Sequence, residues 1–121
     1  MTTTANLLGS GTPGLTADAI TGFPSLAQTA TGASQGSLAL PSDFVVYTTS
    51  TLNNGPTLPA TTSSGDSFVI GNATANSINV WPPTGGSIGS GSANAALAVP
   101  AGKTGVFYAL GNGSFVAVVS A

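Results

Sequence analysis

The chain has 121 residues, of which only 3% are charged: one is Lys or Arg, three are Asp or Glu, and there is no His or Cys. This length fits one ordinary domain, or a smaller domain with a tail, because single domains typically have ~100–150 residues. The charged residues are Asp18, Asp43, Asp66 and Lys103. Catalysis near neutral pH usually relies on a His base or a Cys nucleophile, so we expect a protein that is not an enzyme.

The same composition excludes several kinds of partner. Zinc, haem and iron–sulfur sites need imidazole or thiolate ligands, so we expect no metal and no cofactor. One Lys cannot neutralise a phosphate backbone, which argues against nucleic acid. The longest apolar runs, 106–110 and 115–119, fall short of the ~20 residues of a membrane helix. The amino end lacks the basic region of a secretory signal, so we expect synthesis in the cytoplasm and no membrane partner.

The net charge is −2. Electrostatic repulsion between copies is weak at such a charge, which suits molecules held in fixed places in an assembly. The alternative is that the abundant Ser, Thr and Asn side chains solvate a monomer.

Residues 1–36 are interrupted by Gly and Pro so often that no long helix or strand fits between them. We interpret this range as an extended amino-terminal arm that docks on neighbouring subunits through its apolar residues. The alternative is a frayed terminus, because chain ends are commonly mobile. The apolar residues of the arm are Leu7, Leu8, Leu15, Ile20, Phe23 and Leu26.

Residues 37–121 are predicted to form one β domain. Short segments rich in Val, Ile, Phe and Tyr alternate there with clusters of Gly, Pro, Asn and Ser, which is typical of strands and turns. Helix signals are weak, because the range lacks a sustained apolar period of three to four residues. The expected strands are 37–40, 44–50, 67–71, 77–81, 95–99, 105–110 and 114–120.

The last two of these strands are joined by Gly111-Asn112-Gly113, a tight connection that predicts an antiparallel hairpin. The whole pattern predicts an all-β fold, a small antiparallel β-sandwich or barrel of the jelly-roll kind. A core confined to the last two-thirds of the chain is marginal by itself, which favours oligomerisation.

Several short motifs resemble known sites but lack the necessary context. Residues 9–14 match the dinucleotide pattern G-x-G-x-x-G, yet no strand precedes them and Pro13 discourages the following helix. Gly102-Lys103-Thr104 lacks the first glycine of a phosphate-binding loop. Gly65-Asp66-Ser67 has no His to activate the serine, and Asp43 and Asp66 are better explained as turn residues than as a glycosidase pair.

The segment Trp81-Pro82-Pro83 ends a predicted strand, because proline cannot donate a ladder hydrogen bond. Trp81 is then expected in the core or at an interface. A second interpretation makes Trp81 an aromatic platform for a sugar or peptide.

Two stretches resemble a module of tailed-bacteriophage virion proteins. Residues 76–88 begin Asn-Ser-Ile-Asn-Val-Trp-Pro-Pro-Thr-Gly-Gly, and residues 92–115 include the turn Ala-Gly-Lys-Thr followed by the closing hairpin. In that module a strand ends in an aromatic-Pro-Pro-x-Gly turn and a small-residue loop follows. The resemblance covers roughly residues 65–121.

A short chain with this module is similar to phage head decoration, or capsid cement, proteins. The resemblance implies a structural virion protein on the outer capsid surface that binds and stabilises adjacent major capsid subunits. We expect a homo-oligomer, with a trimer favoured and a dimer possible. The alternative is a head-fibre or tail-associated module that binds host glycans. The candidate capsid or subunit interface residues are Leu7, Leu8, Leu15, Ile20, Phe23, Leu26, Trp81, Pro82 and Pro83.

Overall fold

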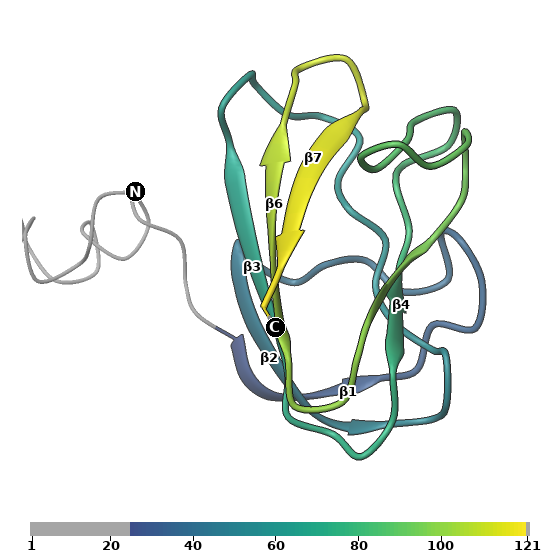
Figure 1. The fold of residues 1–121 in the computed structure, drawn as a ribbon, viewed down its shortest axis with the longest axis vertical. Helices are drawn as coiled ribbons and strands as arrows, with labels where there is room; N and C mark the ends of the chain where they lie inside the picture. Colours follow the sequence, from purple (N-terminus) through teal and green to yellow (C-terminus); the bar gives the residue numbers. More distant parts are fainter. Residues whose placement is uncertain (1–24, 121) are drawn as a thin grey trace, which may run out of the picture.

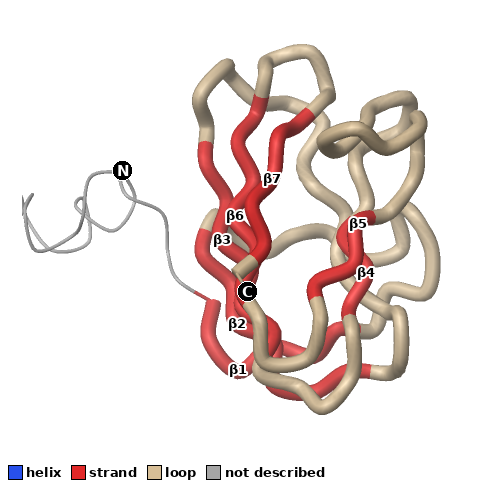
Figure 2. Tube along the Cα trace, viewed as in Figure 1, coloured by secondary structure: helices blue, strands red, loops and turns tan. Residues whose placement is uncertain are grey.

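The computed structural model describes residues 25–120, which form an all-β fold with no helix in that range (Figures 1 and 2). The all-β prediction is therefore confirmed. The strands of this part of the chain are β1 (Ser25–Ala30), β2 (Phe44–Ser50), β3 (Ser67–Asn72), β4 (Ile78–Val80), β5 (Leu97–Val99), β6 (Thr104–Ala109) and β7 (Phe115–Val119).

The strands form a five-stranded sheet in the order β1-β2-β3-β6-β7 and a two-stranded sheet of β4 and β5. β1 pairs parallel with β2, and β2 pairs parallel with β3, whereas the other pairings between these strands are antiparallel. The prediction of a wholly antiparallel arrangement is thus wrong for these two pairings. Parallel neighbours need connections of about a dozen residues or more, and the segments 31–43 and 51–66 provide them without a helix.

The start of the described chain differs from the expected pattern of strands. Residues 25–30, which we assigned to the arm, form β1 at the edge of the large sheet. The predicted strand 37–40 is replaced by a single bridge between Ala39 and Thr57. Pairing stops there because the next donor to the Leu40 carbonyl would be residue 59, a proline without an N–H group.

The small sheet lies opposite the large one, and the core fills the space between them (Figures 1 and 2). Alternate residues of β2 to β7 point to this core, as the two-residue period of a strand requires, whereas β1 contributes only Ala30. The buried residues of both sheets belong to one cluster. They include Val45 and Tyr47 of β2, Ile70 of β3, Ile78 and Val80 of β4, Val99 of β5, Phe107 of β6 and Phe115 of β7.

The predicted hairpin of β6 and β7 is confirmed. Gly111 and Gly113 have φ values of 86° and 84°, a left-handed conformation that glycine adopts without steric cost. The Leu110 N–H donates to the Ser114 carbonyl at 2.9 Å, which closes the turn. The side-chain oxygen of Asn112 accepts from the Ser114 N–H at 3.1 Å. The two glycines thus allow the chain to reverse, and Asn112 holds the turn by a hydrogen bond.

Candidate interaction surfaces

The outer face of the five-stranded sheet carries a continuous row of apolar side chains. Phe44 lies opposite Val69, Val69 opposite Val106, and Val106 opposite Val118, so the row crosses β2, β3, β6 and β7. The neighbours of these residues along each strand, such as Val45 and Ile70, are buried in the core. By the alternation of strand side chains, the row therefore points away from the core.

Several residues of this face are strongly exposed. The exposed fraction is 64% for Val118, 45% for Val116 and 44% for Tyr108, which lies opposite Val116. Large apolar groups gathered on one surface commonly mark a contact with another molecule. We call this set the outer apolar face: Phe44, Val46, Val69, Val106, Tyr108, Val116 and Val118.

The charged residues of the described chain flank the outer apolar face at its two ends. Asp43 and Asp66 directly precede the parallel strands β2 and β3, so both lie at the end where these strands begin. Lys103 directly precedes β6, which runs in the opposite direction, and so lies at the other end. Between these ends, the outward-facing positions of β2, β3, β6 and β7 are Ser, Thr, Gly, Val, Phe and Tyr, and a partner can cover them without desolvating a charge.

Most of the predicted arm residues, Leu7, Leu8, Leu15, Ile20 and Phe23, lie outside the described residues. Leu26 belongs to β1 and is 60% exposed. Its exposed side chain is available to a neighbouring molecule, and its role at an interface stays a prediction.

The segment Trp81-Pro82-Pro83 is held firmly in the domain. The Trp81 N–H donates to the Pro56 carbonyl at 3.0 Å, and the Trp81 carbonyl accepts from the Leu58 N–H at 2.8 Å. Pro82 and Pro83 are buried, whereas Trp81 is half-buried. Of these three predicted interface residues, Trp81 therefore has the most surface to offer a partner.

The glycine-rich loop after Trp81 is fixed by two amide side chains. The Asn94 side-chain oxygen accepts from the Gly85 N–H at 2.7 Å and from Gln35 Nε2 at 3.1 Å. The same Gln35 nitrogen donates to the Pro82 carbonyl at 2.7 Å. These contacts tie together segments that are far apart in the sequence, and nothing in the sequence pattern signalled the role of Gln35 or Asn94.

Two buried polar side chains differ in how they are satisfied. Asn72 donates through Nδ2 to the carbonyls of Asn76 and Val99, at 2.7 and 2.9 Å, and its oxygen accepts from the N–H and hydroxyl of Thr74. The Asn72-Ala73-Thr74 sequence is thus a structural turn. The hydroxyl of Tyr47 is buried without a hydrogen-bond partner in the described chain, and burial raises the pKa of Tyr47 to about 12.

The other motifs occupy turns. Asp66 accepts a hydrogen bond from the Ser63 N–H at 2.8 Å in the connection before β3, as expected for a turn aspartate. Lys103 follows the turn at Gly102, whose φ is 74°, and leads into β6. Residues 25–120 contain no group of three or more His, Cys, Asp or Glu side chains able to hold a metal ion.

The outer apolar face is the feature that sequence reasoning missed. Residues 105–110 and 114–120 were predicted as the two strands of the closing hairpin, but the prediction took no account of the apolar residues on both faces of these strands. Two apolar faces on one hairpin are the signal that would have revealed an uncovered surface.

Comparison with known proteins adds nothing to this description of the chain. No protein-family model matches it, and no curated protein or solved structure does so either. Within residues 25–120, no helix has the length and apolar character needed to cross a membrane.

Proposed function

We propose that the protein is a structural virion protein that binds the outer surface of a phage capsid and cements adjacent major capsid subunits. The observation that carries the proposal is the outer apolar face, an uncharged surface on the rigid five-stranded sheet. A surface of this kind suits permanent contact with another protein better than permanent exposure to water.

Burial of the outer apolar face would supply binding free energy. Apolar surface removed from water contributes roughly 25 cal/mol per Å². The paired strands hold the side chains in place before binding, so little conformational entropy is lost on association. The charged residues at the two ends of the sheet stay at the rim of the contact, where they keep their solvent.

Two further features support the proposal. The aromatic-Pro-Pro-x-Gly turn and closing hairpin resemble the phage virion module, and the turn geometry expected there, in particular the hairpin of β6 and β7, is formed. The amino-terminal residues carry apolar groups with a single charge, Asp18, which suits an arm that reaches neighbouring subunits. Cement proteins of this kind gain by symmetric assembly, and we favour a trimer.

The test is cosedimentation of the purified full-length protein with capsids that lack it. We expect saturable binding at a fixed ratio to the major capsid subunit. Absence of binding, or binding that never saturates, would contradict the proposal.

The alternative function is a head-fibre or tail-associated module that binds host glycans. It is favoured by one observation, the partly exposed Trp81 beside a loop that Gln35 and Asn94 hold in place. Aromatic faces are common sugar-binding surfaces. If this alternative holds, Trp81→Ala abolishes binding to host cells; binding equal to that of the parent protein would exclude it.

A further inference from the structure

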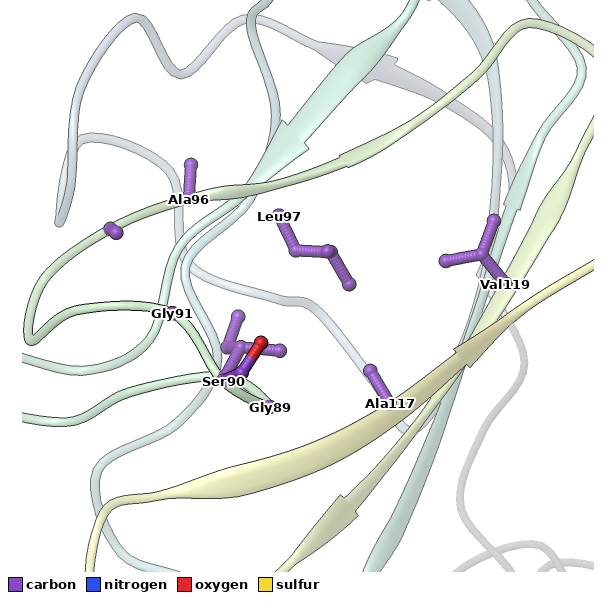
Figure 3. A pocket seen from close by; sticks show the side chains of 9 residues that line it. Gly89, Ser90, Gly91, Ala96, Leu97, Ala117 and Val119 are labelled. Carbon is purple, nitrogen blue, oxygen red and sulfur yellow. The ribbon is translucent and has the colours of Figure 1, made fainter.

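A groove runs between the two sheets on the open side of β7. Its volume is about 460 Å³, enough for several water molecules or for apolar side chains. Ile88, Ala117 and Val119 line the groove on one side, and Leu97 and the small residues of the loop before β5 line it on the other. Figure 3 shows Leu97 extending into this space from β5, with Ala117 and Val119 on β7 across from it.

Beyond Phe115, the backbone edge of β7 along this groove has no hydrogen-bond partner among the described residues. At Phe115, the N–H donates to the Ser87 carbonyl at 2.9 Å and the carbonyl accepts from the Gly89 N–H at 2.8 Å. These groups point away from β6, whereas the Ser120 N–H points toward β6 and donates to the Thr104 carbonyl. Because backbone directions alternate along a strand, those of Ala117 and Val119 point away from β6 as well.

Residues 87–89 therefore cover only the first residue of the open edge. Ile88 pairs parallel with Phe115, and the chain then turns away at Gly89, whose φ is 59°. Within residues 25–120, no backbone group pairs with Ala117 or Val119 on this side. An exposed strand edge is a template for another strand, and here it adjoins an apolar groove.

We propose that an extended segment from residues 1–24 of a second copy of this chain adds as a strand to the open edge of β7. Its backbone would pair with Ala117 and Val119, and its large apolar side chains would enter the groove beside Leu97. This is strand addition, in which main-chain hydrogen bonds supply affinity and side-chain pockets supply specificity. The inference concerns contact between copies and stands whether or not the protein binds a capsid.

The chemistry of the segment matches that of the groove. Residues 1–24 contain one charged residue, Asp18, and five large aliphatic or aromatic residues, Leu7, Leu8, Leu15, Ile20 and Phe23. None of the residues that line the groove is charged. An apolar side chain in the groove would remove water from the edge of the core at Leu97, Ala117 and Val119, which are only partly buried.

The position of the segment in the chain favours a second copy over the same molecule. Residue 25 begins β1 at one edge of the sheet, and β7 forms the opposite edge, about 19 Å away at ~4.8 Å per strand spacing. The segment is long enough to cross the whole sheet to its own groove, but the residues used for the crossing could then not pair with β7. A neighbour whose β1 edge lies beside β7 presents residue 25 near the groove, and the segment can then extend for up to about 80 Å.

Each copy would give one segment and accept one segment. Such a head-to-tail contact is heterologous, and it produces a closed ring when the rotation between copies allows closure.

The test uses two full-length variants and their mixture. In the first, Ala117→Phe fills the groove but leaves the segment intact. In the second, Leu7, Leu8, Leu15, Ile20 and Phe23 are all replaced by Ser, which leaves the groove intact without adding charge. The mass of each sample is measured by analytical ultracentrifugation, and circular dichroism confirms that each variant is folded.

We expect the parent protein to be oligomeric and each variant to be monomeric, near 11.6 kDa. The mixture should form a 1:1 pair, because the first variant can only give a segment and the second can only accept one. Ala98→Phe is the matched control: Ala98 is exposed on β5, adjacent to Leu97, and does not line the groove, so this variant should stay oligomeric.

A monomeric parent protein would overturn the proposal, since insertion would then be absent or confined to one molecule. Variants that assemble like the parent, or a mixture that remains monomeric, would overturn it equally. If Ala117→Phe does not fold, Ala96→Phe on the loop wall of the groove replaces it in the mixture.

Discussion

Val106 and Val118 lie directly opposite each other in the β6–β7 ladder, on the face of the sheet that points away from the core. Pairs of β-branched residues at such positions stabilise a sheet by packing against each other. This pair is packed on one side only, and Val118 is 64% exposed. The hairpin therefore has two apolar faces, of which the fold itself covers one.

Val118→Lys tests the outer apolar face. We expect capsid binding to weaken at least tenfold, because a charge would be buried in an uncharged contact. The free energy of unfolding should change by less than about 0.5 kcal/mol, since the side chain is exposed. Cosedimentation and chemical denaturation measure the two effects.

Leu52→Lys is the control for this substitution. Leu52 is 61% exposed, nearly the same as Val118, but it lies in the connection after β2 and outside the outer apolar face. Binding should be unchanged. Equal weakening by both variants would show that added charge, and not the face, is responsible.

Tyr47 predicts a loss of stability in alkali. Burial raises its pKa from near 10 to about 12, so the folded state keeps the phenolic proton between these values while the unfolded state releases it. Unfolding then releases a proton, and stability falls as pH rises. The contribution is fully present below pH 10, and about 2–3 kcal/mol is lost by pH 12. Denaturant titrations from pH 8 to 12 measure this slope.

Tyr47→Phe should remove that part of the alkaline loss. It should also raise the free energy of unfolding at pH 7 by about 1 kcal/mol, because a buried hydroxyl without a partner is lost. Tyr108→Phe, at an exposed position, is the control and should retain the alkaline loss. A lower stability of Tyr47→Phe at pH 7 would contradict the assignment of an unsatisfied hydroxyl.

Among the described polar residues, we expect substitution of Asn72 to lower the free energy of unfolding most. Asn72→Ala leaves the Val99 carbonyl without its side-chain donor and should lower the free energy of unfolding by about 2–4 kcal/mol. Asn72→Asp preserves the shape but replaces the Nδ2 donor by an oxygen that faces two carbonyls, so it should be no better. Thermal unfolding of both variants checks this. A stable Asn72→Asp protein would mean that shape, and not donation, is what the site needs.

Gly55→Ala tests a close approach between segments. A Cβ at residue 55 would overlap the backbone carbonyl of Asn79 on β4, so we expect a loss of about 3 kcal/mol or more in the free energy of unfolding. Gly71→Ala is the control, because its Cβ would meet only ordinary contacts, the nearest at 3.5 Å. That variant should be neutral or slightly stabilised, since alanine lowers the entropy of the unfolded chain.

Local turn chemistry made part of the fold predictable. Gly111-Asn112-Gly113 predicted the hairpin, and the clusters of Gly and Pro placed most strands within a few residues. The parallel pairings could not be predicted, because direction depends on where the long connections 31–43 and 51–66 return the chain. β1 was missed because Ser25–Ala30 has little strand propensity, and its pairing with β2 is a tertiary effect.

Among the candidate surfaces, only the one at Trp81 could be predicted, because the single Trp of the chain stands out in the sequence. The outer apolar face depends on the pairing of four strands, so the sequence showed its members but not their adjacency. The groove beside β7 exists because the small residues of the loop before β5 face Ala117 and Val119 of β7. No local sequence pattern encodes such a contact between distant segments.

The parallel pairing of β1, β2 and β3 has a consequence for how the chain folds. The hairpin of β6 and β7 needs only a short loop and can form in microseconds, whereas each parallel pair must first close a long connection. Sheets dominated by such distant pairings fold in milliseconds to seconds. During that interval the hairpin exposes apolar groups on both faces, so the unassembled protein should be most prone to aggregation before β3 docks on β6.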